Sequence, residues 1–160
     1  MSEVIENKRN NALYEVIKRI IDIVASFIGL ILLSPLMLIV SILIKLESKG
    51  EVIFKQKRVG LNGKEFYMYK FRSMVINAEE LKAELESKNE MSGPMFKIKD
   101  DPRITKVGNL IRKTSIDELP QLINVIKGDM SLVGPRPSLQ KEVEKFEPWM
   151  MERLKVKPGL

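Results

Sequence analysis

The sequence contains neither cysteine nor histidine in its 160 residues. Without cysteine, the protein forms no disulfide, iron–sulfur cluster, thiolate nucleophile or cysteine-based zinc site. Without histidine, it lacks the commonest general base, the commonest metal ligand and any serine–histidine triad. Any chemistry therefore depends on carboxylates, amines, guanidiniums and hydroxyls, alone or with a hard cation that prefers oxygen ligands.

The chain is basic: it has 27 Lys and Arg residues and 21 Asp and Glu residues, which gives a net charge of +6. This balance favours phosphate-bearing partners: nucleic acid, anionic lipid or a nucleotide. No helix-turn-helix, zinc-finger or RNP signature is present, and the aromatic residues between Phe66 and Phe71 have the pattern of a strand. We therefore expect no nucleic-acid partner. The common glycine-rich phosphate loops are also missing.

A long apolar run extends from Ile20 to Ile44. It is long enough to cross a bilayer, too long for a signal peptide, and not followed by a small-residue cleavage site. Ser34 and Pro35 interrupt it, and proline frees a backbone carbonyl one turn earlier that a serine hydroxyl can satisfy. The two arms, Ile20–Leu33 and Leu36–Ile44, are roughly 21 and 14 Å long at about 1.5 Å per residue, so neither crosses a hydrocarbon core of about 30 Å.

Basic residues stand on both sides of this run: Lys18 and Arg19 before it, and Lys45 and Lys49 after it. A helix that spans the membrane carries its basic residues mainly at its cytoplasmic end. A helix that enters the bilayer, breaks and returns to the same face accounts for two basic ends. A spanning helix with a proline kink is the alternative, and charge and proline by themselves leave the choice open.

The start of this helix is predicted near Ala12, with Asn10 and Asn11 as candidate N-caps, because apolar residues then recur at helical spacing. One acidic residue, Asp22, stands near the beginning of the apolar run. It follows Lys18 by one helical turn, and we interpret it as the partner of that lysine in an intrahelical ion pair.

The part of the chain after the apolar run is of mixed polarity and long enough to bury a core. Val52–Lys57 and Glu65–Phe71 have strand patterns, and Asn62-Gly63 between them is a strong turn signal, so they predict a β-hairpin. Helices are expected at 78–90 behind an Asn77 cap, from Pro120 to Gly128, and at Leu139–Phe146. In the second of these helices, the residues expected to pack inward are Leu122, Ile123, Val125 and Ile126. Loops and short helical pieces are expected over Met91–Arg112. The expected fold is α+β and mainly helical.

The stretch RKTSIDELPQL, from Arg112 to Leu122, is the most informative for chemistry. Read as a helix start, Ser115 is an N-cap and Glu118 completes a capping box. Pro120 argues against this, because it would then lie beyond the first turn and forfeit a helical hydrogen bond. With Pro120 at the first helical position, Asp117 and Glu118 stand on irregular backbone, where adjacent carboxylates beside basic residues suit a divalent cation or a phosphate. Residue types alone leave both interpretations open.

Two further basic positions are candidates for phosphate binding. Arg136 stands between two prolines in Gly-Pro-Arg-Pro, so its backbone has little entropy to lose on binding, and its guanidinium can grip two phosphate oxygens. The alternative is a rigid turn whose arginine points into water. Lys70 and Arg72 form another basic cluster at the end of a predicted strand, where a solvated face of an edge strand is the alternative.

Taken together, these pieces resemble the bacterial sugar transferases, the monotopic polyprenyl-phosphate phosphoglycosyl transferases. The matching segments are KRIIDIVASFIGLILLSPL, FKQKRVGLNGKEFYMYKFRSM, DDPRITKVGNLIRKTSIDELPQLINVIKGDMSLVGPRP and the closing KPGL. They occur in the order of the family and cover nearly everything from Lys18 to the end.

The resemblance implies a re-entrant membrane helix (helix–break–helix) broken at Ser34-Pro35, within a membrane-associated segment 1–44. It also implies a small globular catalytic domain, 45–160, on the cytoplasmic side of the bacterial inner membrane. Members of the family continue beyond the Pro-Gly that precedes Leu160 here. The domain is therefore expected to be C-terminally short relative to the family, with part of the active-site wall missing.

The resemblance also implies the reaction. A nucleoside diphosphate sugar, usually a UDP-sugar, gives its sugar 1-phosphate to polyprenyl phosphate at the bilayer, as the first step of surface polysaccharide or glycan assembly. The family's nucleophilic aspartate matches Asp117 and forms a phosphosugar intermediate, and its neighbour matches Glu118. Both carboxylates are expected to hold Mg²⁺, and Lys70, Arg112 and Arg136 match basic positions that bind the phosphates and substrate.

Two other hypotheses account for the same residues. The first is a membrane-anchored basic binding protein without catalysis, whose Asp-Glu pair is only a helix cap. The second is a related transferase that transfers the group directly and forms no adduct on Asp117. No residue pattern identifies the sugar, the nucleotide, the pathway or the oligomeric state.

Overall fold

The computed structural model describes residues 2–84, 98 and 101–160. It is mainly helical with one two-stranded antiparallel sheet, which confirms the expected fold class in outline. The elements are α1 (Ser2–Glu47), β1 (Ile53–Val59), β2 (Glu65–Phe71), α2 (Ala78–Glu84), α3 (Lys106–Lys113), α4 (Gln121–Lys127) and α5 (Gln140–Val143), with 3₁₀ turns at Leu61–Gly63, Ile116–Glu118 and Pro148–Lys155. The rest of the predicted helix 78–90 and most of the loop predicted over 91–100 lie outside the described residues.

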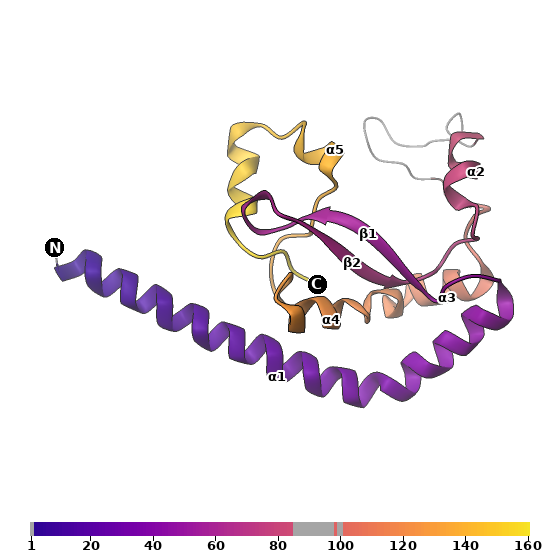
Figure 1. Ribbon diagram of the computed structural model, residues 1–160, viewed down its shortest axis with the longest axis horizontal. Helices are drawn as coiled ribbons and strands as arrows, with labels where there is room; N and C mark the ends of the chain where they lie inside the picture. Colours follow the sequence, from indigo (N-terminus) through magenta and orange to yellow (C-terminus); the bar gives the residue numbers. More distant parts are fainter. Residues whose placement is uncertain (1, 85–97, 99–100) are drawn as a thin grey trace.

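Helix α1 is a single helix, and its predicted boundaries are wrong at two places. It starts at Ser2, so Asn10 and Asn11 lie inside it and are not its N-caps. It also continues through Pro35, where separate arms were expected, although Figure 1 shows that α1 bends. Pro35 has no N–H to donate to the carbonyl of Ile31, and the Ser34 hydroxyl donates to that carbonyl instead, at 2.8 Å. The helix therefore bends but is not interrupted at the proline.

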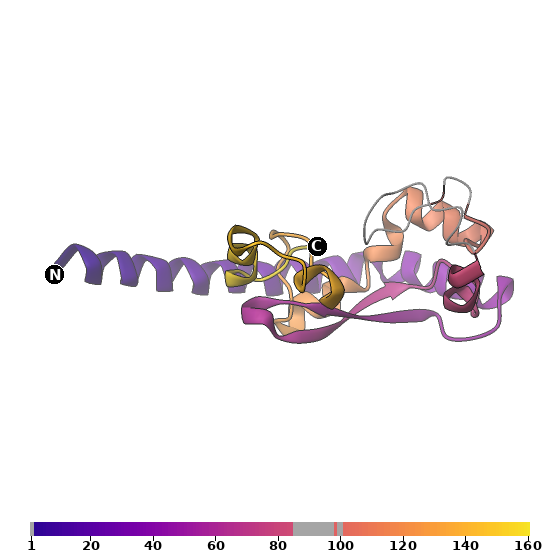
Figure 2. The same ribbon diagram turned by 90° about the horizontal axis from the view of Figure 1, so that it is seen from above.

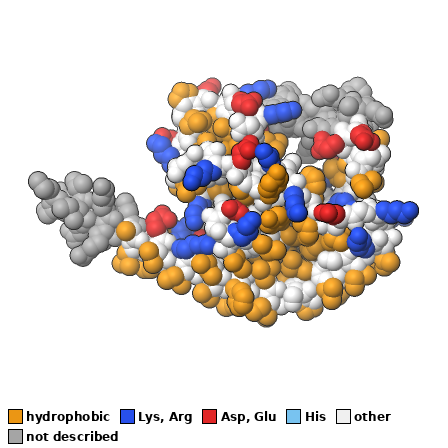
Figure 3. Space-filling view, viewed as in Figure 1, with side chains coloured by type: hydrophobic (Ala, Val, Ile, Leu, Met, Phe, Trp, Pro, Cys, Tyr) orange, Lys and Arg blue, Asp and Glu red, His pale blue; other side chains and the backbone are white. Residues whose placement is uncertain are grey.

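Most apolar side chains of α1 from Ala12 to Glu47 are exposed. Ala12–Glu47 is, within the part of the chain that the structure describes, the one helical segment long and apolar enough to cross a membrane. Phe27, Leu32 and Leu38 are 57%, 72% and 63% exposed. In Figure 3 a band of orange side chains follows the lower edge of the molecule, where α1 runs. An apolar surface of this length marks α1 as a candidate membrane anchor.

The opposite side of α1 packs on the rest of the chain, and Figures 1 and 2 show the helix running along one side of the other elements. Val40 and Ile44 of α1 form a buried cluster with Phe71 of β2 and Ile111 of α3. A second cluster joins Met68 of β2 to Val125 of α4 and to Met130. Side chains of α1 thus contribute to the core beneath the hairpin.

Polar contacts fasten α1 to α4 and to the chain after it. Arg19 donates to the carbonyls of Val125 and Ile126 in the last turn of α4 at 2.6 and 2.7 Å, and the Val125 carbonyl also accepts from the N–H of Gly128 at 3.0 Å. Asp22 lies 3.6 Å from Lys18, which confirms the predicted pair. Asp22 is also buried and accepts a hydrogen bond from the backbone N–H of Leu132 at 3.1 Å, a tertiary contact that helical spacing does not reveal.

The predicted hairpin is confirmed, with β1 extending two residues beyond its expected end. The turn contains Asn62 and Gly63 at φ of 55° and 76°, conformations that glycine and asparagine tolerate best. The outer edge of β2 is closed by Asn124 of α4, whose amide accepts from the N–H of Tyr69 at 3.0 Å and donates to the carbonyl of Tyr67 at 2.7 Å. This side chain makes the hydrogen bonds to β2 that a third strand would otherwise make.

The C-terminal helices agree only in part with the predictions. α4 ends at Gly128, which has the left-handed conformation of a helix C-cap, as expected. Ile123 was expected to pack inward, but it is 40% exposed. α5 is shorter than the predicted Leu139–Phe146, because the N–H groups of Lys145 and Phe146 bond to carbonyls three residues back, not four.

Candidate active site

The carboxylates Asp117 and Glu118 stand on the 3₁₀ turn Ile116–Glu118, just ahead of α4. Ser115 has a left-handed backbone conformation with φ of 56°, and its side chain makes no cap hydrogen bond. The capping-box interpretation is therefore wrong. Pro120 directly precedes the first residue of α4, so the backbone of both carboxylates lies outside regular helix, as the position of Pro120 indicated.

α3 brings a basic residue to these carboxylates. Thr105 caps its N-terminus by accepting from the N–H of Gly108 at 2.9 Å. Gly108 lies so close to the backbone of Ser73, just beyond β2, that any side chain there would collide with it. The last turn of α3 carries Arg112. The close packing of α3 on the end of β2 thus sets the position of this arginine.

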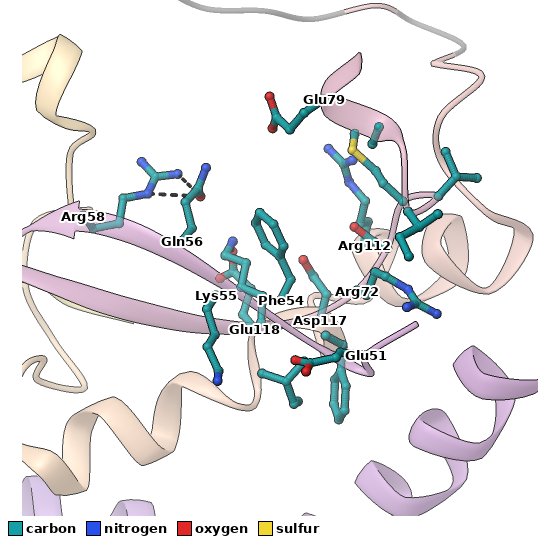
Figure 4. A pocket seen from close by; sticks show the side chains of 18 of the residues that line it. Glu51, Phe54, Lys55, Gln56, Arg58, Arg72, Glu79, Arg112, Asp117 and Glu118 are labelled. Atoms are coloured by element: carbon teal, nitrogen blue, oxygen red, sulfur yellow. Dashed lines mark hydrogen bonds and ion pairs between the residues drawn. The ribbon is translucent and has the colours of Figure 1, made fainter. Parts of the chain in front are cut away.

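All five predicted site residues line one cavity of about 780 Å³, which lies over one face of the hairpin (Figure 4). They come from β2, α3, the 3₁₀ turn and the loop before α5, and they are Lys70, Arg112, Asp117, Glu118 and Arg136. Residues far apart in the sequence therefore meet in one pocket, whose lining holds six Lys and Arg side chains and four carboxylates, including the adjacent pair Asp117 and Glu118. Such a pocket suits a ligand with several phosphate charges.

Asp117 is the more buried of the two carboxylates, with 9% of its surface exposed. Burial raises the pKa of its carboxyl above the usual range, and the charge of Glu118 acts in the same direction. The charges of Lys70 and Arg112 oppose this rise by favouring the ionised form. A carboxylate in such a setting is a stronger base and nucleophile than one in water, provided that cations keep it ionised.

Glu118 is paired with Lys70, since 2.6 Å separate its Oε1 from the Lys70 Nζ. The lysine side chain is 19% exposed and the glutamate side chain 40% exposed, so the pair lies at the wall of the cavity. An entering phosphate can compete with Glu118 for the ammonium group. The Glu118 carboxylate would then be available to bind a cation.

The two carboxylates also define what kind of metal ion fits this site. Among residues 2–84, 98 and 101–160, no group of three or more potential ligands from His, Cys, Asp and Glu is present. Mg²⁺ is commonly held by one or two carboxylates, with water and substrate phosphates as its other ligands. Asp117 and Glu118 fit that pattern only when a phosphate ligand shares the cavity.

One face of β1 supplies functional candidates that the sequence analysis missed. Phe54, Gln56 and Arg58 alternate along the strand and line the same cavity (Figure 4). Arg58 donates to Gln56 Oε1 from Nη2 at 2.8 Å and to the carbonyl of Pro137 at 3.1 Å. Arg58 thereby ties the Arg136 loop to the hairpin. The alternation in FKQKR was the signal that could have revealed this face.

Arg72, the other member of the predicted basic cluster, has a structural contact. Its Nη2 donates to the carbonyl and the hydroxyl of Ser48, each at 2.8 Å, and so joins the end of β2 to the chain after α1. Burial and the neighbouring charge of Arg136 lower the pKa of Arg58, which nevertheless stays protonated. Among these arginines, Arg112 and Arg136 are the ones with no described hydrogen bond from the guanidinium to protein atoms, which suits them to bind a ligand.

Comparison with known proteins identifies the family. The family model of the bacterial sugar transferases matches residues 13–160, nearly the whole chain. The chain belongs to this family. The bacterial sugar transferase described here therefore has the membership that its ordered motifs predicted.

This bacterial sugar transferase has several similar relatives. It is 51% identical over 143 residues to galactosyl transferase CpsE of Streptococcus agalactiae, a match that covers 89% of this chain and 32% of that protein. It is 48% identical over 151 residues to a UDP-N-acetylgalactosamine-undecaprenyl-phosphate N-acetylgalactosaminephosphotransferase of Aeromonas hydrophila, covering 92% of this chain and 33% of that one.

A third relative, a putative undecaprenyl-phosphate N-acetylgalactosaminyl 1-phosphate transferase of Bacillus subtilis, is 48% identical over 136 residues, with 85% of this chain and 70% of the relative covered. The chain thus spans about a third of the length of the first two relatives and more of the third.

Proposed function

We propose that this bacterial sugar transferase moves a sugar 1-phosphate from a UDP-sugar to polyprenyl phosphate, the first step in assembling a surface polysaccharide or glycan. The observation that carries the proposal is the buried carboxylate of Asp117, held beside Lys70 and Arg112 in a cavity lined by further cationic side chains. The names of the Aeromonas and Bacillus relatives, which include undecaprenyl phosphate and a sugar phosphate, support the choice of substrates.

The reaction follows from the chemistry of the cavity in two steps. An oxygen of Asp117 forms a bond to the β-phosphorus of the donor, and the bond from that phosphorus to the bridging oxygen breaks, so that UMP leaves with the electron pair. An oxygen of polyprenyl phosphate then forms a bond to the same phosphorus. The bond between phosphorus and Asp117 breaks, which restores the carboxylate and leaves the sugar on a lipid diphosphate.

Cationic side chains make these steps feasible. A carboxylate attacks an anionic diphosphate poorly unless the phosphate charge is neutralised. Lys70, Arg112 and Arg136 line the cavity and can contact the phosphate oxygens. Because Arg136 is next to Pro137, whose carbonyl accepts a hydrogen bond from Arg58, the side chain starts from a fixed backbone. Binding therefore costs little conformational entropy there.

Mg²⁺ is part of the proposal, with Asp117 and Glu118 as the residues that would hold it. The ion, when bound, supplies positive charge that neutralises the diphosphate of the donor. To bind the ion, the Glu118 carboxylate would give up its present partner, the ammonium group of Lys70.

We further propose that α1 is re-entrant, with both ends at the cytoplasmic face of the bacterial inner membrane. In this proposal, residues 1–44 associate with the membrane and residues 45–160 form the cytoplasmic catalytic domain. The bend of α1 and its packing along the side of the other elements support a shallow position, because a helix that crosses the bilayer would project away from them (Figure 1).

An intact-mass measurement with the donor alone tests the mechanism. The full chain in lipid nanodiscs is mixed with Mg²⁺ and a panel of UDP-sugars, without an acceptor. We expect a mass increase equal to one sugar phosphate less one water, located on Asp117, together with released UMP. Transfer to undecaprenyl phosphate without an adduct would indicate direct transfer. If neither adduct nor transfer occurs with any donor, the noncatalytic binding protein is the better hypothesis.

A further inference from the structure

A second cavity, of about 560 Å³, lies beside the active-site cavity, and we call it the hairpin groove. It is lined by Val52, Ile53, Tyr69, Pro120 and Ile123, together with one acidic and one basic residue, Glu51 and Lys55. Lys55 pairs with Tyr69 across the hairpin, whereas Phe54 pairs with Lys70. Because side chains alternate between the faces of a strand, Lys55 and Tyr69 face away from the side that carries Lys70. In Figure 4, Lys55 points away from Phe54 and Gln56.

One apolar side chain of α4, that of Ile123, is exposed at this groove and does not pack in the core. In α4, Leu122 and Val125 are buried, whereas Ile123 between them is 40% exposed. Ile123 belongs to neither buried cluster of the described residues and lines the groove instead. An isoleucine in this place offers an apolar surface to a ligand.

The groove is continuous with the active site at one end. Ile53, Lys55 and Glu51 line both cavities. Pro120, which lines the groove, is next to the turn that carries Asp117 and Glu118. A ligand in the groove can therefore extend its end past the shared residues into the cavity that holds the carboxylates.

The groove also faces the side of the molecule on which α1 lies. α4, which supplies Ile123, packs against α1, and Figure 1 shows α4 between the hairpin and α1. In Figure 3, a patch of orange side chains, with white and blue ones around it, lies between the lower edge, where α1 runs, and the hairpin. An apolar path thus connects the exposed surface of α1 with the active-site cavity.

We propose that the hairpin groove binds the first isoprene units of the polyprenyl phosphate acceptor, an assignment that rests on the proposed function. Isoprene units have no hydrogen-bonding groups, so they bind by apolar contact, which Ile53, Tyr69 and Ile123 offer. Lys55 at the shared wall supplies a positive charge for the acceptor phosphate. The donor occupies the cationic cavity on one face of the hairpin, and the lipid reaches Asp117 from the other.

Replacing Ile123 tests this assignment. In Ile123→Ser, we expect KM for the acceptor to rise roughly five- to tenfold, since part of an isoleucine contact is lost. The rise should be similar for undecaprenyl phosphate in nanodiscs and for farnesyl phosphate in detergent, because both have the same first isoprene units. The rate of adduct formation from the UDP-sugar alone should not change. Val133→Ser is the matched control, since Val133 is 77% exposed and lines neither cavity.

The outcomes separate the groove from the reaction itself. An unchanged KM for the acceptor in an active Ile123→Ser enzyme overturns the groove and leaves the proposed function intact. A change seen only with undecaprenyl phosphate in nanodiscs also overturns it, because it indicates altered seating in the membrane. Wild-type protein that gives neither adduct nor transfer overturns the proposed function, and the groove assignment with it.

Photocrosslinking gives a second measurement that needs no variant. The probe is farnesyl phosphate with a diazirine on its first isoprene unit, added to the wild-type chain in nanodiscs. We expect the label at 51–55 or 120–123, the segments that line the groove, and competition by undecaprenyl phosphate. Label confined to α1 would overturn the assignment.

Discussion

Lys70 and Glu118 form an ion pair at 2.6 Å that joins β2 to the turn ahead of α4. The pair connects the candidate phosphate-binding lysine directly to a candidate metal ligand. Each group neutralises the other until a ligand enters, so phosphate binding and cation binding at this site are expected to be coupled. Substitution of either residue is therefore expected to change both phosphate binding and cation binding.

Glu118→Gln is expected to lower turnover about 10- to 100-fold and to raise the Mg²⁺ concentration needed for half-maximal rate. The amide is a weaker ligand for the cation and leaves the ammonium group of Lys70 without its counter-charge. Steady-state rates over a Mg²⁺ titration measure both effects, with Glu65→Gln as a control, because Glu65 is also paired with a lysine, Lys57, but lies outside the cavity. A Mg²⁺ profile like that of the wild type would assign Glu118 a structural role.

Asp117→Asn is expected to reduce turnover by roughly three orders of magnitude or more and to abolish the adduct, because an amide cannot attack phosphorus. The same change should not destabilise the fold at neutral pH. Burial raises the pKa of Asp117 in the folded state above the unfolded value of 3.8, so the folded state holds the proton more tightly. Stability is therefore lost as pH rises from the unfolded pKa through the folded one.

Thermal unfolding from about pH 4 to about pH 8, without Mg²⁺ or donor, checks the sign of this effect. The Tm of Asp117→Asn relative to wild type should increase with pH, since asparagine cannot acquire the buried charge. A variant that is less stable than wild type at neutral pH would show that the carboxylate holds the fold together.

Arg136→Lys is expected to behave as a substantial loss of function. A guanidinium grips two phosphate oxygens at once, whereas an ammonium presents one point charge. The loss of a charge-assisted contact should cost about 1.5–3 kcal/mol, roughly a 10- to 150-fold fall in kcat/KM for the donor. Tm should change little. An unfolded variant would identify Arg136 as a structural clamp, and an unchanged kcat/KM would reduce Gly-Pro-Arg-Pro to a turn.

Pro35→Ala is expected to straighten α1, because the alanine N–H can donate to the carbonyl of Ile31 that Ser34 now satisfies. Tags at Ser2 and at the C-terminus should both be cytoplasmic in the wild type, and the variant should shift toward a spanning form. Ser34→Ala is the control that keeps the proline. Protease protection of either tag in sealed vesicles measures the outcome, and tags on opposite sides in the wild type would contradict re-entry.

Arg19→Ala is expected to destabilise the protein by about 2–3 kcal/mol, since the guanidinium donates two charge-assisted hydrogen bonds to the last turn of α4. Chemical denaturation in detergent measures this change. Arg153→Ala, which loses one exposed hydrogen bond of 3.3 Å and a cation–π contact with Phe146, should cost less. Equal losses in the two variants would show that α1 is not held by these contacts.

The sequence predicted most reliably those features that depend on neighbours along the chain. Asn62-Gly63 identified the hairpin because few residues tolerate the backbone of that turn. Pro120 and Gly128 bracketed α4, since proline favours a helix start and glycine a left-handed cap. Pro120 also argued against a Ser115 cap, but the sequence left both interpretations open, and the left-handed backbone of Ser115 decided between them. Family motifs then selected Lys70, Arg112 and Arg136, which proved to share one cavity with the carboxylates.

By itself, therefore, the sequence determined where the elements and the reactive groups lie along the chain, because turns, caps and apolar runs are local signals. Only the tertiary structure decided which side chains meet. It placed Ile123 at a groove although its spacing favoured the core, and it aligned Phe54, Gln56 and Arg58 along the cavity. It also kept α1 continuous at Pro35. Contacts between distant segments depend on how the elements pack, and periodicity within a single element carries no information about its neighbours in space.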